Sequence, residues 1–221
     1  NEIKHGRLPK NLLPLQSGVG SVANAVISGL AQGPFTNLSI YTEVIQDGMF
    51  DLIDAGKVEV CSGTALSPSP DGLKRFYDNV DEYSKKIILR PQEISNSPEI
   101  ARRIGVIAMN TAIEVDIYGN VNSTHVCGTK LMNGVGGSGD FARNGYLTVF
   151  FTNSLAKGGK ISSVVPFCSH IDHATLDVDV IVSERGVADL RGLSPKEKAP
   201  IIIDQIANPK YQPWLYDYFK R

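Results

Sequence analysis

Residues 38–61 read LSIYTEVIQDGMFDLIDAGKVEVC, and this stretch decides the fold. Leu38–Thr42 and Lys57–Cys61 are short, mostly apolar runs of the kind that form buried strands. A helix-like segment, Phe50–Asp54, lies between them. Strand, helix and strand in this order favour an α/β sheet over separate layers of helices and strands.

The same alternation continues along the chain and predicts an open, mostly parallel or mixed sheet flanked by helices. Further strands are expected at Lys86–Leu89, Gly105–Asp116, Leu147–Thr152, Ile161–Phe167 and Val178–Ser183. Further helices are expected at Ser21–Ala31, Pro98–Arg103, Arg185–Leu190 and Pro195–Ala207. Pro200 should disturb the last of these helices, and Ser62–Gly72, rich in turn-forming residues, predicts a surface loop.

Composition and charge exclude several classes of function. The 221 residues are 42% hydrophobic, which is enough for one full domain or for one large and one small lobe. A net charge of -1 offers no basic surface for nucleic acid or membrane. Three widely spaced cysteines suggest neither disulfides nor a thiolate zinc site. We therefore expect cytoplasmic small-molecule chemistry. The missing initiator methionine suggests a fragment or a processed chain.

Glu43 is the main candidate for chemistry. It follows an apolar run and precedes a turn-like segment, Gln46–Gly48. Two glycine loops, Gly18–Gly20 and Gly134–Gly139, could bring backbone amides to it. A carboxylate nucleophile beside preorganised amide donors is the minimum equipment for covalent acyl transfer.

The first glycine loop allows a second interpretation. Gly18, Gly20 and Ala23 satisfy the dinucleotide-binding pattern, and Glu43 lies near the position of the ribose-binding acid. Against a nucleotide-binding module, Pro14 makes the preceding segment, residues 11–16, a poor buried parallel strand because proline lacks a ladder donor. A tight turn before a core helix is an equally ordinary explanation of the two glycines.

The second glycine loop is denser in glycine. Four glycines between Gly134 and Gly139 are costly to order, which suggests a close backbone approach or positive φ angles. Ser138 does not form a nucleophile elbow, because Asp140 stands where that motif requires glycine. A flexible surface turn is the alternative, and the flanking apolar and aromatic residues argue against it.

Several longer strings resemble the acetyl-CoA hydrolase/transferase family, in particular its succinyl-CoA:acetate CoA-transferase branch among the class I CoA-transferases. They are QSGVGSVAN at 16–24, YTEVIQDG at 41–48, DIYGNVNST at 116–124, NGVGGSGDFAR at 133–143, KGGKISSVVP at 157–166 and VIVSERGVADLRG at 180–192. The resemblance implies a CoA-transferase-like α/β domain that forms the C-terminal half of an enzyme with two similar halves. Residues 1–14 would then be a linker from the N-terminal half, 15–208 the domain, and 209–221 a docked aromatic tail.

The resemblance also assigns roles to residues. It implies that Glu43 forms a glutamyl-CoA thioester and that the amides of Val19 and Gly137 bind the oxyanion. Residues implied to contact CoA are Gln16, Ser17, Gly18, Val19, Gly20, Gly134, Gly136, Gly137 and Lys157. Acyl-CoA and short-chain carboxylates are the expected substrates, the N-terminal half is an expected partner, and a homodimer is expected. Acetyl-CoA hydrolysis by the same glutamate is the nearest alternative activity.

Three further residues have both a functional and an ordinary interpretation. Asn96 resembles an asparagine that orients the glutamate, but it could equally cap the helix that begins near Pro98. Glu184 resembles a second active-site carboxylate, or could be an exposed glutamate paired with Arg185. Lys157, with Lys160, could meet CoA phosphates or simply be solvated.

The spacing of the histidines does not predict a metal site. His170, Asp172 and His173 lie close in sequence, but residues 169–175 need not be helical, so their side chains need not converge. Hydrogen-bonding roles are favoured for these residues and for His5 and His125. We expect CoA as a substrate, with neither a metal nor a prosthetic group.

Overall fold

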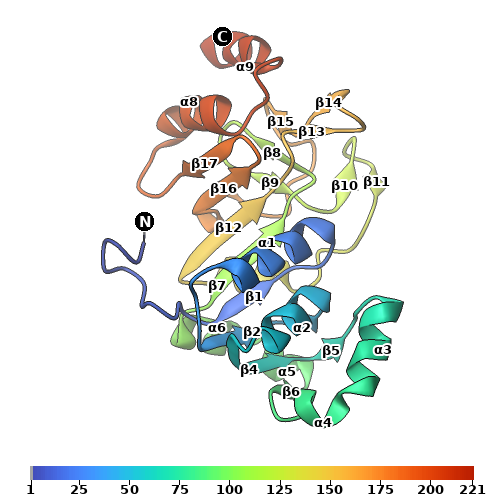
Figure 1. Ribbon diagram of the computed structural model, residues 1–221. Helices are drawn as coiled ribbons and strands as arrows, with labels where there is room; N and C mark the ends of the chain where they lie inside the picture. Colours follow the sequence, from blue (N-terminus) through green and yellow to red (C-terminus); the bar gives the residue numbers. More distant parts are fainter. Residues whose placement is uncertain (1) are drawn as a thin grey trace. The chain divides into compact units, whose positions relative to one another are not determined.

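The computed structural model describes residues 2–221, and the chain divides into two compact units (Figure 1). The first unit comprises Asn1–Met109 and Asn144–Tyr146, of which residue 1 lies outside the described part. The second unit comprises Asn110–Arg143 and Leu147–Arg221. The division between the units falls at residues 109–110, 143–144 and 146–147, so it does not test the predicted boundaries at 14 and 208, which remain predictions.

The first unit contains a parallel sheet whose central strand is β1 (Leu15–Ser17). It pairs with β7 (Ile107–Thr111) on one side and β2 (Leu38–Tyr41) on the other. β4 (Val58–Gly63) and β6 (Ile87–Leu89) extend the sheet beyond β2. Two short strands, β3 (Val44–Ile45) and β5 (Ala65–Leu66), pair separately. Parallel strands place their carboxyl ends at one edge, where α/β folds bind ligands.

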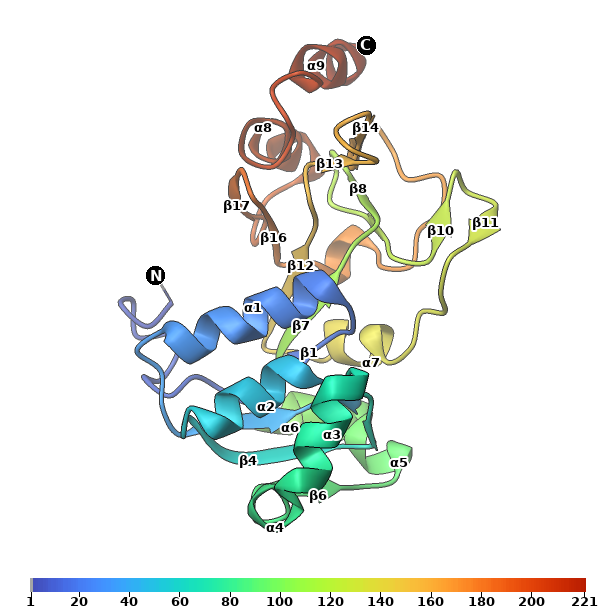
Figure 2. The same cartoon turned by 45° about the vertical axis from the view of Figure 1, so that its right-hand side comes forward.

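Six helices belong to the first unit. They are α1 (Ser21–Gln32), α2 (Asp47–Asp54), α3 (Pro70–Asp78), α4 (Val80–Tyr83), α5 (Gln92–Ser95) and α6 (Pro98–Ile104). α1 and α2 contact each other and run side by side in Figures 1 and 2. Phe50 of α2 is fully buried, stacks with Phe76 of α3 and packs at a tilt against Tyr83 of α4, which ties these three helices together.

The second unit is built around β12 (Leu147–Phe151), β16 (Val180–Ser183) and β17 (Gly186–Asp189). β16 is parallel to β12 and antiparallel to β17. A smaller sheet places β8 (Glu114–Asp116) between β9 (Val121–Asn122) and β15 (Val164–Val165). Two hairpins pair β10 (His125–Val126) with β11 (Lys130–Leu131) and β13 (Leu155–Ala156) with β14 (Ile161–Ser162).

The helices of the second unit complete its core. They are α7 (Ser138–Ala142), the short 3₁₀ helix Thr175–Asp177, α8 (Pro195–Gln205) and α9 (Gln212–Lys220). α8 lies beside β17 in both views (Figures 1 and 2). Phe150, Ile181, Ile202 and Leu215 are fully buried in one apolar cluster. Because Leu215 is part of it, α9 packs on this core.

The predicted α/β class with a mostly parallel, mixed sheet is confirmed, and most predicted elements are present. The prediction of a helix at Arg185–Leu190 is wrong. Residues Gly186–Asp189 form β17, in which the exposed Val187 and the buried Ala188 point to opposite sides. The single strand expected over 105–116 is instead two strands, β7 and β8.

Proline positions explain three other differences. Pro14 does not prevent a strand, because β1 begins at Leu15 and the Pro14 carbonyl accepts a bond from the Ile107 amide at 2.8 Å. Pro70 occupies the first turn of α3, where no amide donor is needed, so the predicted loop over 62–72 ends in a helix. α8 continues through Pro200, starting from a capping box between Ser194 and Glu197. The turn expected at 46–48 is the start of α2.

None of the helices within residues 2–221 combines the length and the apolar character that crossing a bilayer would require.

Candidate active site

Glu43 lies at the carboxyl end of β2, where its backbone is held firmly. Its carbonyl oxygen accepts hydrogen bonds from the amides of Thr64 at 2.7 Å and Ala65 at 3.3 Å. The preceding residue, Thr42, donates its amide to the Ser62 carbonyl at 3.0 Å. The Glu43 residue is half-buried. It therefore stands at the sheet edge where ligands bind in α/β folds.

Hydrogen bonds join the first glycine loop and its flanking residue Ser17 to residues on either side of Glu43. The Thr42 hydroxyl donates to the Ser17 carbonyl at 3.1 Å, and the Gly20 amide donates to the Gln46 side-chain oxygen at 3.4 Å. One bond joins the residue before the loop to the residue before Glu43, and the other joins the end of the loop to a residue that follows Glu43. The signal in the sequence was the glycine pattern, whereas nothing local identified Thr42 or Gln46 as its partners.

The backbone of this loop leaves one amide available. Gly20 has a φ of 108°, which favours glycine, and precedes the first turn of α1. Val19 is 57% exposed, and no group in the described part of the chain accepts a hydrogen bond from its amide. By contrast, the Gln16 side-chain oxygen accepts from the Met109 amide at 3.1 Å, and the Ser17 hydroxyl donates to the Gly18 carbonyl. Gln16 and Ser17 thus use these side-chain bonds to shape the loop.

Asn96 lies directly after α5, and its environment excludes the ordinary explanation. Ser97, not Asn96, caps α6 and accepts a bond from the Ile100 amide, so the interpretation of Asn96 as an N-cap is wrong. The Tyr41 hydroxyl donates to the Ile94 carbonyl and ties α5 to β2, two residues before Glu43. Both polar atoms of the Asn96 side chain are buried and have no hydrogen-bond partner among residues 2–221.

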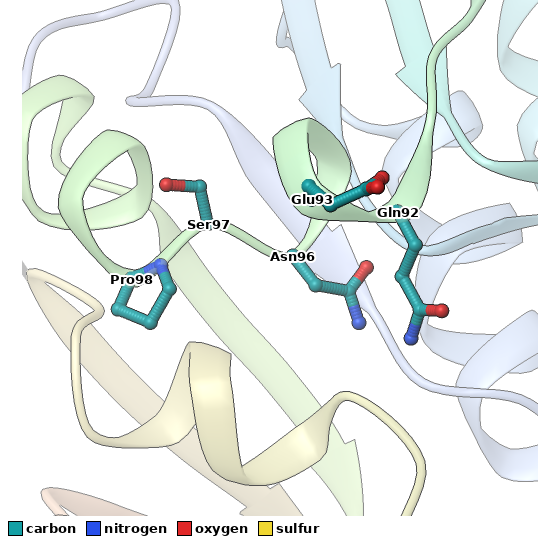
Figure 3. Close-up of a pocket in the computed structure, with 5 residues that line it drawn as sticks. All are labelled: Gln92, Glu93, Asn96, Ser97 and Pro98. Carbon is teal, nitrogen blue, oxygen red and sulfur yellow. The ribbon is translucent and has the colours of Figure 1, made fainter.

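A pocket of about 530 Å³ opens at Asn96 and is lined by Gln92, Glu93, Asn96, Ser97 and Pro98. The amides of Asn96 and Gln92 extend to the same side of α5 (Figure 3). Buried polar groups are almost always hydrogen-bonded, so an unpaired buried amide requires an explanation. A ligand or a reacting side chain that supplies the missing partner is such an explanation.

The second unit carries the remaining candidates. Gly137 is buried at the start of α7, whereas Gly134 and Gly136 are exposed. Gly136 has a φ of 56°, in the region that favours glycine. Lys157 is exposed in the turn between β13 and β14 and has a φ of 47°. The Lys157 side chain, exposed in the turn between β13 and β14, is therefore accessible to an anion.

Glu184 follows β16 and is held by Ser154, a residue that sequence reasoning missed. The Ser154 amide donates to one carboxylate oxygen at 2.8 Å, and its hydroxyl donates to the other. Burial alone would raise the pKa of Glu184, but the bonds from Ser154 outweigh burial and hold it below its ordinary value. The carboxylate is therefore fixed by Ser154 and not by an ion pair with Arg185.

The histidines do not form a metal-binding group. His170 lies 3.2 Å from a carboxylate oxygen of Asp172, while the His173 ring faces the hydroxyl of Ser138 at 3.1 Å. Within residues 2–221, no three histidine, cysteine or acidic side chains gather closely enough to hold an ion. His170 and His173 instead make hydrogen bonds to side chains of the second unit.

The fold is that of a CoA-transferase-like domain. The chain superimposes on RipA from Yersinia pestis with a TM-score of 0.83 and 27% identity, covering 99% of this chain and 51% of RipA. A 4-hydroxybutyrate CoA-transferase from Porphyromonas gingivalis has the same fold, with a TM-score of 0.75 and 23% identity over 99% of this chain and 53% of its own.

Sequence comparison is more specific. Residues 72–219 match the acetyl-CoA hydrolase/transferase C-terminal domain. The chain is 65% identical over 219 residues to a succinyl-CoA:acetate CoA-transferase of Clostridium kluyveri. It is 53% identical to a propanoyl-CoA:succinate CoA transferase of Escherichia coli and 52% identical to an acetyl-CoA hydrolase of Candida albicans. The chain therefore belongs to the acetyl-CoA hydrolase/transferase family, which confirms the resemblance read from the sequence.

The matches cover nearly all of this chain but less than half of each relative. The three relatives align over 99%, 99% and 100% of this chain, and over 41%, 45% and 43% of their own lengths respectively. In the Clostridium relative the matching part is the C-terminal one.

Proposed function

We propose that this chain is the C-terminal half of an enzyme that transfers CoA between a short-chain acyl-CoA and a carboxylate, such as succinyl-CoA and acetate. The observation that carries the proposal is Glu43 linked to the first glycine loop, where Val19 is exposed and its amide has no hydrogen-bond partner among residues 2–221. Identity of 65% to a succinyl-CoA:acetate CoA-transferase supports the choice of substrates.

The proposed reaction begins with attack by the Glu43 carboxylate on the thioester carbonyl of acyl-CoA. A carboxylate can act as the nucleophile in such covalent catalysis. Collapse of the tetrahedral intermediate expels CoA thiolate and leaves an acyl-glutamyl anhydride. The thiolate then attacks the glutamyl carbonyl, which releases the first carboxylate and forms a glutamyl-CoA thioester. An incoming carboxylate reverses these two steps and leaves as the new acyl-CoA.

Each tetrahedral intermediate carries a negatively charged oxygen. We propose that the amides of Val19 and Gly137 donate hydrogen bonds to this oxygen. A donor of this kind is worth roughly 3 kcal/mol in the transition state. Asn96 is proposed to hold the Glu43 carboxylate during the reaction, which would satisfy its buried side-chain amide. Glu184 and Lys157 are proposed to contact substrate and CoA, together with Gly134 and Gly136.

Acetyl-CoA hydrolysis is the second candidate, because the chain is also 52% identical to an acetyl-CoA hydrolase. In that reaction water attacks the glutamyl-CoA thioester and no new acyl-CoA appears. The other half of the enzyme is a proposed partner for either reaction, and we propose that the complete enzyme is a homodimer.

The test is to trap the intermediate in the full-length protein. After addition of acyl-CoA, borohydride should reduce the glutamyl thioester and change the mass of the peptide that contains Glu43. The variant Glu43→Gln should show no change. Unmodified wild-type protein would refute the proposal, and NAD binding in that case would support a nucleotide-binding module. Supplying acetate and succinate separately then distinguishes transfer, which forms new acyl-CoA, from hydrolysis, which releases free thiol.

A further inference from the structure

The second glycine loop, Asn133–Gly139, has little intrinsic rigidity. A side chain added at Gly134 or Gly139 would meet nothing within 4 Å, so packing does not fix these positions. Glycine backbones are also the most costly to order. Something else must hold the loop in one conformation if Gly137 is to place an amide accurately.

Two side chains within the loop supply part of that restraint. The Asn133 side-chain amide donates to the carbonyl of Ser123 at 2.9 Å and to that of Gly134 at 3.0 Å. At the other end, the Ser138 hydroxyl lies 2.8 Å from the Val135 carbonyl. Ser138 directly follows Gly137, so this second bond acts next to the proposed oxyanion donor.

His173 extends the restraint to the core of the second unit. Its Nε2 lies 3.1 Å from the Ser138 hydroxyl, although the two residues are 35 positions apart. The His173 ring is fully buried and packs on Phe150, with 4.8 Å between ring centroids. Its backbone pairs with Val121 in both directions, at 2.9 and 3.1 Å. The imidazole is therefore an immobile point to which the loop is attached.

The bonding pattern assigns the proton on this imidazole. A carbonyl oxygen can only accept, so the single hydroxyl hydrogen of Ser138 goes to Val135. Nε2 of His173 must then carry a hydrogen and donate it to Ser138, with Ser123 as a weaker second acceptor at 3.4 Å. Nδ1 has no partner in the described part of the chain, which suits an unprotonated nitrogen.

The charges around His173 agree with a neutral ring. Burial is the largest influence and lowers the pKa of His173. Asp172 and Asp177 act in the opposite direction, and Arg143 adds to the lowering. The Asp172 carboxylate is itself engaged by the Ser123 amide at 2.8 Å and the Thr124 hydroxyl. The net direction favours the neutral form, which keeps Nε2–H directed at Ser138.

We propose that His173 is a positioning residue: through its Nε2–H bond to Ser138 it holds the second glycine loop in the conformation that presents the Gly137 amide to the oxyanion. This role rests on the proposed function, because it concerns the proposed oxyanion donor. His173 takes no part in bond making, and it neither gives up nor receives a proton during the reaction.

The experiment compares five variants of the full-length protein, including the double variant Ser138→Ala/His173→Phe. Ser138→Ala removes the acceptor for His173 together with the bond to Val135, His173→Phe keeps the aromatic packing but removes the donor, and His173→Gln keeps an amide donor. Tyr216→Phe is the matched control, since it deletes one hydroxyl bond, to Asp204 at 2.9 Å, in α9. Hydrogen exchange of the peptide spanning 133–139 reports loop order, and steady-state kinetics report catalysis.

Ser138→Ala and His173→Phe should each speed exchange in the loop and lower kcat roughly tenfold, less than complete loss of an oxyanion donor. KM for acyl-CoA should change by less than about threefold, because the bond acts mainly in the transition state. The double variant should be no worse than Ser138→Ala alone, since Ser138→Ala already removes the bond that His173→Phe breaks. His173→Gln should recover most of kcat, and Tyr216→Phe should leave loop exchange and kcat as in the wild type.

Unchanged loop exchange in Ser138→Ala would overturn the role of His173 even if catalysis falls. Multiplicative losses in the double variant would also overturn it. Failure to trap Glu43 in the wild type refutes the proposed function separately, and loop exchange is measured without reference to that reaction. Ser138 is only half-buried, so Ser138→Ala keeps the test valid if His173→Phe does not fold.

Discussion

The hydroxyl of Thr42 donates to the carbonyl of Ser17 at 3.1 Å, and this buried bond joins the residue before Glu43 to the residue before the first glycine loop. The two residues are 25 positions apart: Ser17 ends β1, and Thr42 directly follows β2, the parallel neighbour of β1. This bond and the bond from the Gly20 amide to the Gln46 side chain therefore help to set the position of Glu43, the proposed nucleophile, relative to the Val19 amide.

Thr42→Val should disturb that position at modest cost in stability. Valine preserves the shape but removes the donor, so the free energy of unfolding should fall by about 1 kcal/mol. Loss of alignment should lower kcat/KM roughly tenfold. Thr42→Ser keeps the hydroxyl and should restore most activity. Equal activity in the valine and serine variants, measured with acyl-CoA and acetate, would contradict this role for the bond.

Gly20 and Gly29 provide a matched pair for testing backbone conformation. A side chain at either position would meet nothing within 4 Å, but only Gly20 has a positive φ. Gly20→Ala should therefore cost about 1–3 kcal/mol of strain and lower activity by displacing the Val19 amide. Gly29→Ala, inside α1, should stabilise the protein by about 0.5–1 kcal/mol without loss of activity. Chemical denaturation and kinetics of both variants provide the comparison. Similar effects at the two positions would show that φ does not control the loop.

Local patterns in the sequence were sufficient for the α/β class, and they identified Glu43 and a glycine loop as candidates for the site. They failed where the apolar residues of a short segment fit both the helical and the strand repeat, as at Arg185–Leu190. Whether Gly186–Asp189 becomes strand or helix depends on the pairing partner, β16, and pairing is not a local property. Pro14 led to a wrong expectation because a proline disrupts a buried strand only from within it, whereas Pro14 lies one residue before β1 begins.

The contacts that support the candidate site were harder to predict for a related reason. Ser17 with Thr42 and Ser138 with His173 are hydrogen bonds between residues 25 and 35 positions apart. A serine or threonine carries no sign of its distant partner. Asn96 was ambiguous because asparagine and serine both cap helices, and only the coordinates show that Ser97 does so.

Asn96→Leu should separate stability from activity. The wild-type amide is buried without a partner, and such a group costs about 1–3 kcal/mol, so leucine of similar volume should leave stability equal or higher. Activity should fall at least roughly tenfold, because Glu43 would lose the group proposed to align it. Thermal unfolding and kcat should thus move in opposite directions or only kcat should change. A clear loss of stability would show that the amide has a structural partner.

Ser154→Ala should alter the pH dependence of stability through Glu184. The pKa of Glu184 is lowered in the folded protein, so its contribution is present above the ordinary glutamate pKa of ~4.3 and is lost as pH falls through the folded value. Removing the Ser154 hydroxyl leaves only the amide donor and brings the folded pKa closer to the ordinary one. The difference in unfolding free energy between wild type and variant should therefore be largest near neutral pH and shrink in acid.

Glu184→Gln is the matched background for this measurement, because glutamine keeps the shape and does not titrate. In that background Ser154→Ala should change stability by the same amount at every pH between 4 and 7. If the difference stays constant with pH in the wild-type background too, the Ser154 hydroxyl does not stabilise the ionised carboxylate. The pH-dependent part can arise only from the charge on Glu184, so the two backgrounds together separate the charge-assisted bond from the loss of packing at Ser154.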